Sequence, residues 1–409
     1  MKKTLLSMAL MAASGAAVAG DYYNGRLTGM SGAGYATGGY ADGVVYNPSL
    51  GAKFDEQDDF GLVFNGGVLG EDEDDLIDGL EDLADYLDEL EEKTAYDYFD
   101  EIGGFDPNDP LASEQEASQL IEEEAEEAIR RLENIADKTA NIGAGGSFVL
   151  ALPNDLLSLS VVGKTRIEAA VQTVVNEEDY QYIRDAVGET NFDPAGLQSY
   201  GVGRGAAVSE VGLAMAKSLQ TGEDSRLLLG ATPKWMHVMT FVYSATVDDF
   251  EEDDFDGDEY TVETDDVNID LGATYLCGDM RYALTVSNLI SNEYETIVPG
   301  DTLEIKPRAT TAVGYEGSWF TAEVAADLNT SPNFATGQET QFVRAGAELN
   351  AFDWAQLRVG FQRDLEDNVE DTVSVGIGFS PFNVVNVDIA GFTGDGNTAG
   401  ASMQLGLRF

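Results

Sequence analysis

The sequence predicts an all-β membrane barrel of about 14 antiparallel strands, with a glycine-rich N-terminal plug and an inserted α-helical hairpin. The final residues, from Ala399 to Phe409, alternate apolar and polar side chains up to the last residue, as in a strand with two different faces. Similar segments recur after residue 140, and the connections between them alternate between long and short. This asymmetry is typical of membrane barrels, which have short turns at one end and long loops at the other.

The first 19 residues predict export. Lys2 and Lys3 precede a short apolar run from Leu5 to Ala13, and Ala17-Val18-Ala19 fits a small-x-small cleavage pattern. We therefore assign residues 1–19 to a signal peptide cleaved after Ala19. No later stretch has the 18 or more apolar residues of a membrane helix, but barrel strands need only about ten alternating residues.

The composition is strongly acidic, with a formal net charge of −53 at pH 7. Nucleic-acid binding needs clustered Lys and Arg, so the charge argues against a nucleic-acid partner. The acidic residues concentrate at 55–59, 71–92, 114–127 and 248–266, whereas the alternating segments carry fewer. Cys277 is the single cysteine, which excludes an intramolecular disulfide.

Residues 20–58 are rich in glycine. They contain Gly32-Ala33-Gly34 and, further on, the turn signal Asn47-Pro48-Ser49-Leu50. These motifs resemble the N-terminal region of the FadL-type long-chain fatty-acid transporter superfamily. The whole layout, with an Asp59–Leu62 strand start, an acidic helical insert and a C-terminal series of strands, is similar to the exported "conjugal transfer protein TraF" barrel family within it.

The resemblance implies a location in the cell outer membrane and passive uptake of a hydrophobic small molecule. It also implies that residues 20–58 form a plug, with the turn Asn47, Pro48 and Ser49 controlling passage; Ser49 stands where the family has Ala. The last strand resembles the terminal strand of bacterial outer-membrane barrels, so Phe409 is expected to be read by the outer-membrane assembly machinery. The alternative function is a non-transporting surface or envelope-assembly protein with a conjugal-transfer-associated role.

Residues 70–140 predict a helical hairpin inserted into the first outer loop. Apolar residues recur at helical spacing in two stretches, separated by Gly103-Gly104 and Asp106-Pro107. Two packings are open: the apolar stripes cover each other, or they form a coiled coil with a partner, which is the contact that the alternative function requires. The stripes are Leu76, Leu80, Leu83, Leu87 and Leu90, and Ile121, Ala125, Ala128, Leu132 and Ile135.

Strand-like segments account for the barrel, residues 59–409. An even number of strands places both chain ends on the same side of the membrane. The predicted segments are 60–68, 141–151, 156–175, 203–217, 226–247, 264–276, 280–288, 308–316, 318–328, 341–351, 354–363, 371–380, 383–392 and 399–409.

Charged residues within the strands are expected to face the lumen. A lipid-facing charge near the bilayer midplane costs about 2–4 kcal/mol, so the outer-membrane lipid contacts the apolar face instead. Opposite charges in the lumen could hold the plug or line a polar channel. The lumen-facing candidates are Arg344, Glu348, Arg358, Asp388 and Arg408.

Catalytic and metal-binding motifs are sparse, and we expect no enzymatic activity. His237 is the only histidine, it lies among large apolar residues, and no Gly-x-Ser-x-Gly motif is present. No cofactor is expected, with one weak exception. Residues 252–263 approach the spacing of an EF-hand calcium loop, but strands rather than helices are expected on either side. The calcium candidates are Glu252, Asp254, Asp256 and Glu263.

Overall fold

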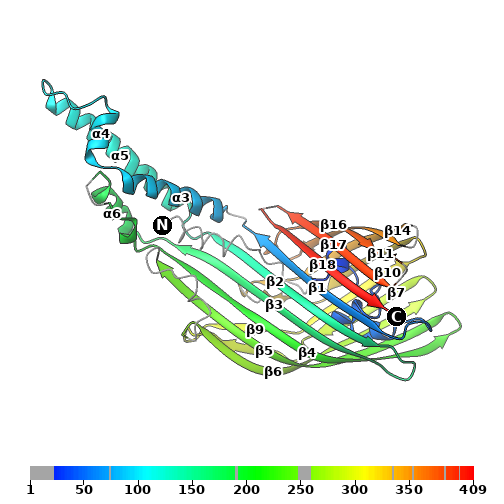
Figure 1. Cartoon of the computed structure of the whole chain (residues 1–409). Helices are drawn as coiled ribbons and strands as arrows, with labels where there is room; N and C mark the ends of the chain where they lie inside the picture. Colours follow the sequence, from blue (N-terminus) through cyan, green and yellow to red (C-terminus); the bar gives the residue numbers. More distant parts are fainter. Residues whose placement is uncertain are drawn as a thin grey trace.

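The computed structural model describes residues 23–72, 75–188, 192–246, 259–333, 336–351, 354–381, 384–395 and 397–409. Fourteen antiparallel strands close into a barrel in the order β1-β18-β17-β16-β15-β14-β11-β10-β7-β6-β5-β4-β3-β2 (Figure 1). The predicted fold class is therefore confirmed. Closure joins the first and last strands, with Gly61 opposite Arg408 and Gly70 opposite Ala399, so no edge of the sheet is left unpaired.

Each predicted strand segment corresponds to one barrel strand. The segment 156–175 stays a single strand, and the longest strands, β4 and β5, reach 23 and 22 residues. The barrel strands are β1 (Gly61–Glu71), β2 (Thr139–Leu152), β3 (Ser158–Val174), β4 (Tyr200–Gly222), β5 (Ser225–Thr246), β6 (Thr261–Cys277), β7 (Met280–Ser287), β10 (Arg308–Glu316), β11 (Phe320–Asp327), β14 (Phe342–Ala351), β15 (Ala355–Asp364), β16 (Thr372–Phe379), β17 (Val385–Gly394) and β18 (Ala399–Arg408).

The outer face of the strands is mainly apolar, and the inner face is polar except where residues such as Val63 and Val162 pack on the chain inside the barrel. In β16 the buried side chains are Thr372 and Ser374, whereas Val375 and Ile377 are 61% and 57% exposed at the outer surface. A soluble barrel would bury the β-branched apolar residues and expose the hydroxyls. This reversed alternation is what a lipid-facing barrel requires.

Two smaller hairpins lie in loops where no strand was predicted. They pair β8 (Asn292–Glu295) with β9 (Thr302–Ile305) and β12 (Ser331–Pro332) with β13 (Glu339–Thr340). The first packs Tyr294, Leu303 and Ile305 against inward-facing Val208 and Val238. Arg204 anchors it through a two-point ion pair with Asp301, at 2.8 and 3.1 Å. It thus covers the inner face of the long strands β4 and β5.

The helices form an arm, residues 75–138, that projects from the long-loop end of the barrel (Figure 1). We call this end the arm end, and the opposite end, with the short turns and Phe409, the turn end. The arm contains α3 (Leu76–Glu92), α4 (Ala95–Glu101) and α5 (Pro110–Asn134), so the predicted hairpin has a third short helix at its far end. Among the residues that the structure describes, no helix is long and apolar enough to cross a membrane.

The apolar stripes of the arm pack against each other, as in the first of the two predicted packings. The five leucines of α3 are buried with Ala125, Ala128, Leu132 and Ile135, and Ile121 packs at their edge. A further helix, α6 (Glu178–Ala186), comes from the loop between β3 and β4 and adds Ile183 to this core. The sequence did not predict α6, because the helix contributes only one fully buried apolar residue and so shows no helical period of apolar residues.

Inside the barrel lies the lumenal segment, residues 23–53, which contains α2 (Gly25–Thr28) and two 3-10 helices, η1 (Gly43–Val45) and η2 (Pro48–Ala52). Almost all of its side chains are buried. Asn24 and Asn47 each cap a helix start, accepting the amides of Leu27 and Ser49. Ser31 and Gly32 have φ of 48° and 81°, a left-handed turn that reverses the chain after α2.

Candidate functional site

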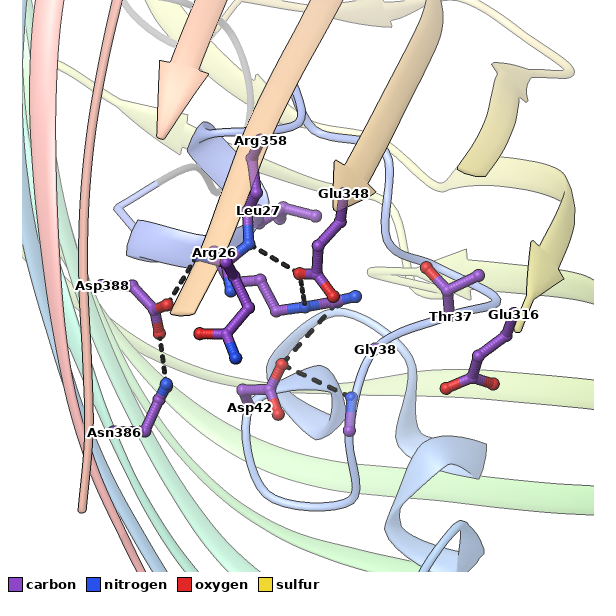
Figure 2. A network of polar contacts seen from close by, with 12 residues as sticks. Arg26, Leu27, Thr37, Gly38, Asp42, Glu316, Glu348, Arg358, Asn386 and Asp388 are labelled. Carbon is purple, nitrogen blue, oxygen red and sulfur yellow. Dashed lines mark hydrogen bonds and ion pairs between the residues drawn. The ribbon is translucent and has the colours of Figure 1, made fainter. Parts of the chain in front are cut away.

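An ion-pair network joins the lumenal segment to the barrel wall near the turn end (Figure 2). Arg26 Nε donates to Glu348 Oε2 at 3.1 Å, and the same oxygen accepts from Arg358 Nε at 2.7 Å. Arg358 Nη1 donates to Asp388 Oδ1 at 2.6 Å. The network therefore runs from the lumenal segment through β14 and β15 to β17, and each charge in it faces an opposite one.

Asp42 extends this network within the lumenal segment. It lies 4.0 Å from Arg26 Nη1 and accepts from Arg408 Nη2 at 3.3 Å. Lys53 adds a second anchor, since its Nζ donates to Glu316 at 2.8 Å and to the carbonyls of Thr37 and Gly38. Buried ion pairs are favourable only when their geometry is close and their remaining donors are satisfied. The Lys53 ammonium has three acceptors and meets that condition, whereas Arg26 Nη1 is buried without a hydrogen bond and has only the 4.0 Å contact with Asp42.

The Asn47-Pro48-Ser49 turn forms a third anchor, against β5 and β6. Asn47 Nδ2 donates to the Tyr35 carbonyl at 2.6 Å and to Thr274 Oγ1 at 2.9 Å, and Ser49 Oγ lies 2.7 Å from Thr274 Oγ1. Asn47, Ser49 and Thr274 are all fully buried. The hydroxyl of Ser49, which an alanine would lack, therefore takes part in the contact with the wall.

Inward-facing glycines make room for this turn. A Cβ on Gly230 would lie 2.4 Å from the backbone of Pro48 and Ser49, and one on Gly272 would lie 2.2 Å from Asn47 Oδ1. The two glycines are opposite each other in the β5–β6 register. On the other side of the lumen Gly360 plays the same part for Met30, with a Cβ distance of 2.3 Å. The wall and the lumenal segment are thus complementary in shape as well as charge.

Two cavities lie towards opposite ends of the barrel, and only the inner one is lined by residues of the lumenal segment. The inner cavity, about 880 Å³, is at the turn end and is lined by Arg26, Asp42, Glu348, Arg358 and Arg408 among others. The outer cavity, about 420 Å³, is at the arm end, and its lining includes Glu71, Asn141, Gln172, Arg204 and Gln338. Between them, Tyr23 and Asn24 lie against Gly146 and Lys164. Both cavities are lined mainly by polar side chains.

The structure places all five lumen-facing candidates on the inside of the wall, but it brings only four of them together. Glu348, Arg358, Asp388 and Arg408 belong to the network around the inner cavity. Arg344 is fully buried and pairs with Asp327 at 2.9 Å, and both residues lie near the arm end. It therefore stabilises the wall, not the contact with the lumenal segment.

A second wall cluster was not foreseen. Glu210 Oε2 lies 3.0 Å from both Lys164 Nζ and Lys234 Nζ, and Lys234 also lies 3.0 Å from Asp270. The alternation of β3 to β6 could have predicted this cluster, because it places all four charged side chains on the inner face of the wall. Arg26, Asp42 and Lys53 gave none, because the lumenal segment has no period from which to infer a direction.

The calcium candidates do not form a described site. Glu252, Asp254 and Asp256 lie outside the described residues, and Glu263 is an exposed residue of β6 within 4.0 Å of His237. Among the described residues, no group of three or more His, Cys, Asp and Glu side chains could hold a metal ion.

His237 lies on the outer face of β5, between Ser209 of β4 and Asp265 of β6 in the register. Its Nδ1 is 2.9 Å from Asp265 Oδ1 and its ring stacks on Trp235. The Ser209 hydroxyl instead lies 2.9 Å from Thr165 Oγ1. Serine hydrolases need the hydroxyl bonded to the imidazole. Asp265 therefore orients the His237 imidazole, but the Ser209 hydroxyl is bonded to Thr165 and not to the imidazole.

Comparison with known proteins gives a family match. The family model described as "F plasmid transfer operon, TraF, protein" matches residues 44–327. No curated protein matches the chain. Similar solved structures include a Pseudomonas aeruginosa FadL homologue, with 10% identity over 97% of this chain and 99% of that one and a TM-score of 0.49. The P. putida toluene transporter TodX shares 8% identity over 93% and 98%, with a TM-score of 0.47.

Proposed function

This chain belongs to the TraF family that its sequence matches, and we propose that it is an outer-membrane protein for passive uptake of small molecules, gated by the lumenal segment. The observation that carries the proposal is the position of that segment. It fills the lumen between the two cavities, and three polar anchors hold it to the wall in addition to the apolar packing of Leu27, Val44 and Leu50 against inward-facing wall side chains.

Polar anchors suit a segment that must move. When the segment moves, its ion pairs and hydrogen bonds can be exchanged for water in the adjoining cavities, whereas its apolar contacts with the wall are lost. In this proposal, release of the Arg26 and Asn47 anchors connects the two cavities. The wall strands stay in place because their own ladders close the barrel.

The proposed ligand is a hydrophobic small molecule, the class that the family resemblance implies. The lining of both cavities does not itself select an apolar ligand, so the experiment compares an apolar and a polar solute of equal size. Uptake of the apolar solute supports the ligand class. Uptake of the polar solute alone supports the channel and overturns that class.

The gating test is a reversible tether. Ser31 Oγ lies 2.8 Å from Ser374 Oγ on β16, so Ser31→Cys with Ser374→Cys, in a Cys277→Ser background, can be joined by a disulfide. We expect uptake into cells or vesicles to stop on oxidation and return on reduction. Each single-cysteine variant is a control, in which oxidation and reduction are expected to leave uptake unchanged. Unchanged uptake in the oxidised double variant overturns gating by this segment.

The location is tested first, by running an outer-membrane fraction on SDS gels with and without boiling. A closed barrel resists SDS until it is heated, so we expect a mobility shift. A soluble periplasmic protein without a shift contradicts the outer-membrane proposal and the uptake proposal with it.

A further inference from the structure

The tip of the arm exposes apolar side chains that its own packing does not require. In the described part of the arm, the exposed large apolar residues are Tyr96, Phe105 and Leu111, which are 76%, 48% and 70% exposed. All three lie around α4 and the start of α5, at the end of the arm furthest from the barrel (Figure 1). Elsewhere along α3 and α5 the exposed positions are mostly acidic or polar.

This tip has a defined shape. The phenol of Tyr98 donates to Glu124 Oε2 at 2.8 Å, and Lys93 bonds both Glu124 and Glu101. Thr94 and Asp97 form a capping box at the start of α4. These bonds hold one face of α4 on α5 and leave the opposite face, with Tyr96, to solvent. Phe99 and Phe105 pack edge to face at 5.7 Å beside it.

The charge around the tip restricts what can cover it. Residues 94–129 contain no Lys, Arg or His, and the exposed residues beside the apolar side chains include Asp100, Asp106, Asp109 and Glu114. Phosphate-bearing partners, whether lipid headgroups or nucleic acids, would be repelled. A second copy of the chain fits no better, because many of its few basic residues are paired inside the barrel.

We propose that the tip, through Tyr96, Phe105 and Leu111 and the acidic residues around them, docks a protein whose surface has an apolar pocket surrounded by Lys and Arg. An apolar centre with a charged rim is the common arrangement of a specific protein interface. The aromatic and leucine side chains fill the pocket, and the acidic rim steers the basic partner towards it. This docking does not depend on the uptake proposal.

The experiment is photo-crosslinking of the full-length protein in its native cells. A photoreactive amino acid replaces Tyr96 in one variant and Asp85, an exposed position midway along α3, in the matched control. We expect a crosslinked protein from position 96 only, identified by mass spectrometry and having a basic surface. A product containing a second copy, lipid or an acidic protein, equal yields at both positions, or no product overturns the proposal.

The identified protein is then purified and its affinity for the full-length chain is measured. Tyr96→Ser with Leu111→Ser is expected to weaken binding at least tenfold, the usual effect of truncating a central apolar contact. Glu114→Gln with Asp106→Asn is expected to slow association and flatten its salt dependence. Unchanged affinity in the first variant overturns the apolar contact, and circular dichroism checks that both variants keep the arm helices.

Discussion

Most charged side chains in the barrel lumen are buried and paired with an opposite charge, whereas those on the arm are exposed and mostly of one sign. In the lumen Arg26, Glu348 and Arg358 alternate in sign within hydrogen-bonding distance. On the arm the acidic residues face water, and the fold depends on the leucines beneath them. The difference follows from solvation, because an unpaired charge is costly where water is excluded and cheap where it is not.

The largest effect is expected in the lumen. Arg358→Met leaves Glu348 and Asp388 buried with less counter-charge, and should lower the free energy of unfolding by about 3–5 kcal/mol. The measurement is urea unfolding of the detergent-solubilised barrel. Arg363→Met is the matched control on the same strand, since Arg363 is 53% exposed and its ion pairs are worth about 0–1 kcal/mol. An equal loss of unfolding free energy in the two variants would contradict the difference proposed between buried and exposed charges.

On the arm, stability should come from apolar packing. Leu87 is almost fully buried, and Leu87→Ala should cost about 3 kcal/mol, which raises cleavage of the arm by an acidic-residue-specific protease about a hundredfold. The boiling-dependent mobility of the barrel should not change. Leu111→Ala, at a 70% exposed position, serves as the control with little effect. A barrel that unfolds together with the arm would show that the two regions are not separable.

Shape complementarity in the lumen can be tested without removing a charge. Gly230→Ala places a methyl group 2.4 Å from the backbone of Pro48 and Ser49, and overpacking of this kind costs about 1–3 kcal/mol. We expect a lower unfolding midpoint. Gly203→Ala is the control, because its nearest neighbour would be the Tyr243 carbonyl at 3.8 Å. If the two variants behaved alike, the turn would not be seated against β5 as described.

The smallest effect is an alkaline loosening of the arm tip. Burial lowers the pKa of Lys93, but its hydrogen bonds to Glu124 and Glu101 outweigh this and the pKa is raised. Burial and the hydrogen bond to Glu124 also raise the pKa of Tyr98. The protonated forms are therefore favoured in the folded state, and their contribution is complete below the ordinary pKa values, about 10 for both residue types.

As the pH rises from the ordinary pKa values through the raised pKa values of Lys93 and Tyr98, this stabilisation is lost. Proteolysis at the tip should increase about tenfold above roughly pH 11, with little change between pH 7 and 9. Tyr98→Phe removes the phenol's part of the transition and leaves that of Lys93. A tip equally protected at pH 8 and pH 11 would show that these bonds do not hold α4 on α5.

Much of the barrel could be predicted because its information is local. Alternation with a period of two identified Val373–Phe379 and the other strands, and it also showed which side chains point inward. The arm followed from the 3.6-residue recurrence of Leu76 to Leu90. Helix α6 was missed because nine residues with one fully buried apolar side chain show too little of that period.

By itself, the sequence determined the fold class, the direction of the charged strand residues and the apolar stripes of the arm, since each depends on residues a few positions apart. Only the tertiary structure decided which charges meet. Arg26 and Glu348 are 322 positions apart, and Asn47 and Thr274 are 227 apart. No local period links such residues, because their contact exists only once the closed wall surrounds the lumenal segment. For the same reason only the structure separated Arg344, which stabilises the wall, from Arg358, which connects the wall to that segment.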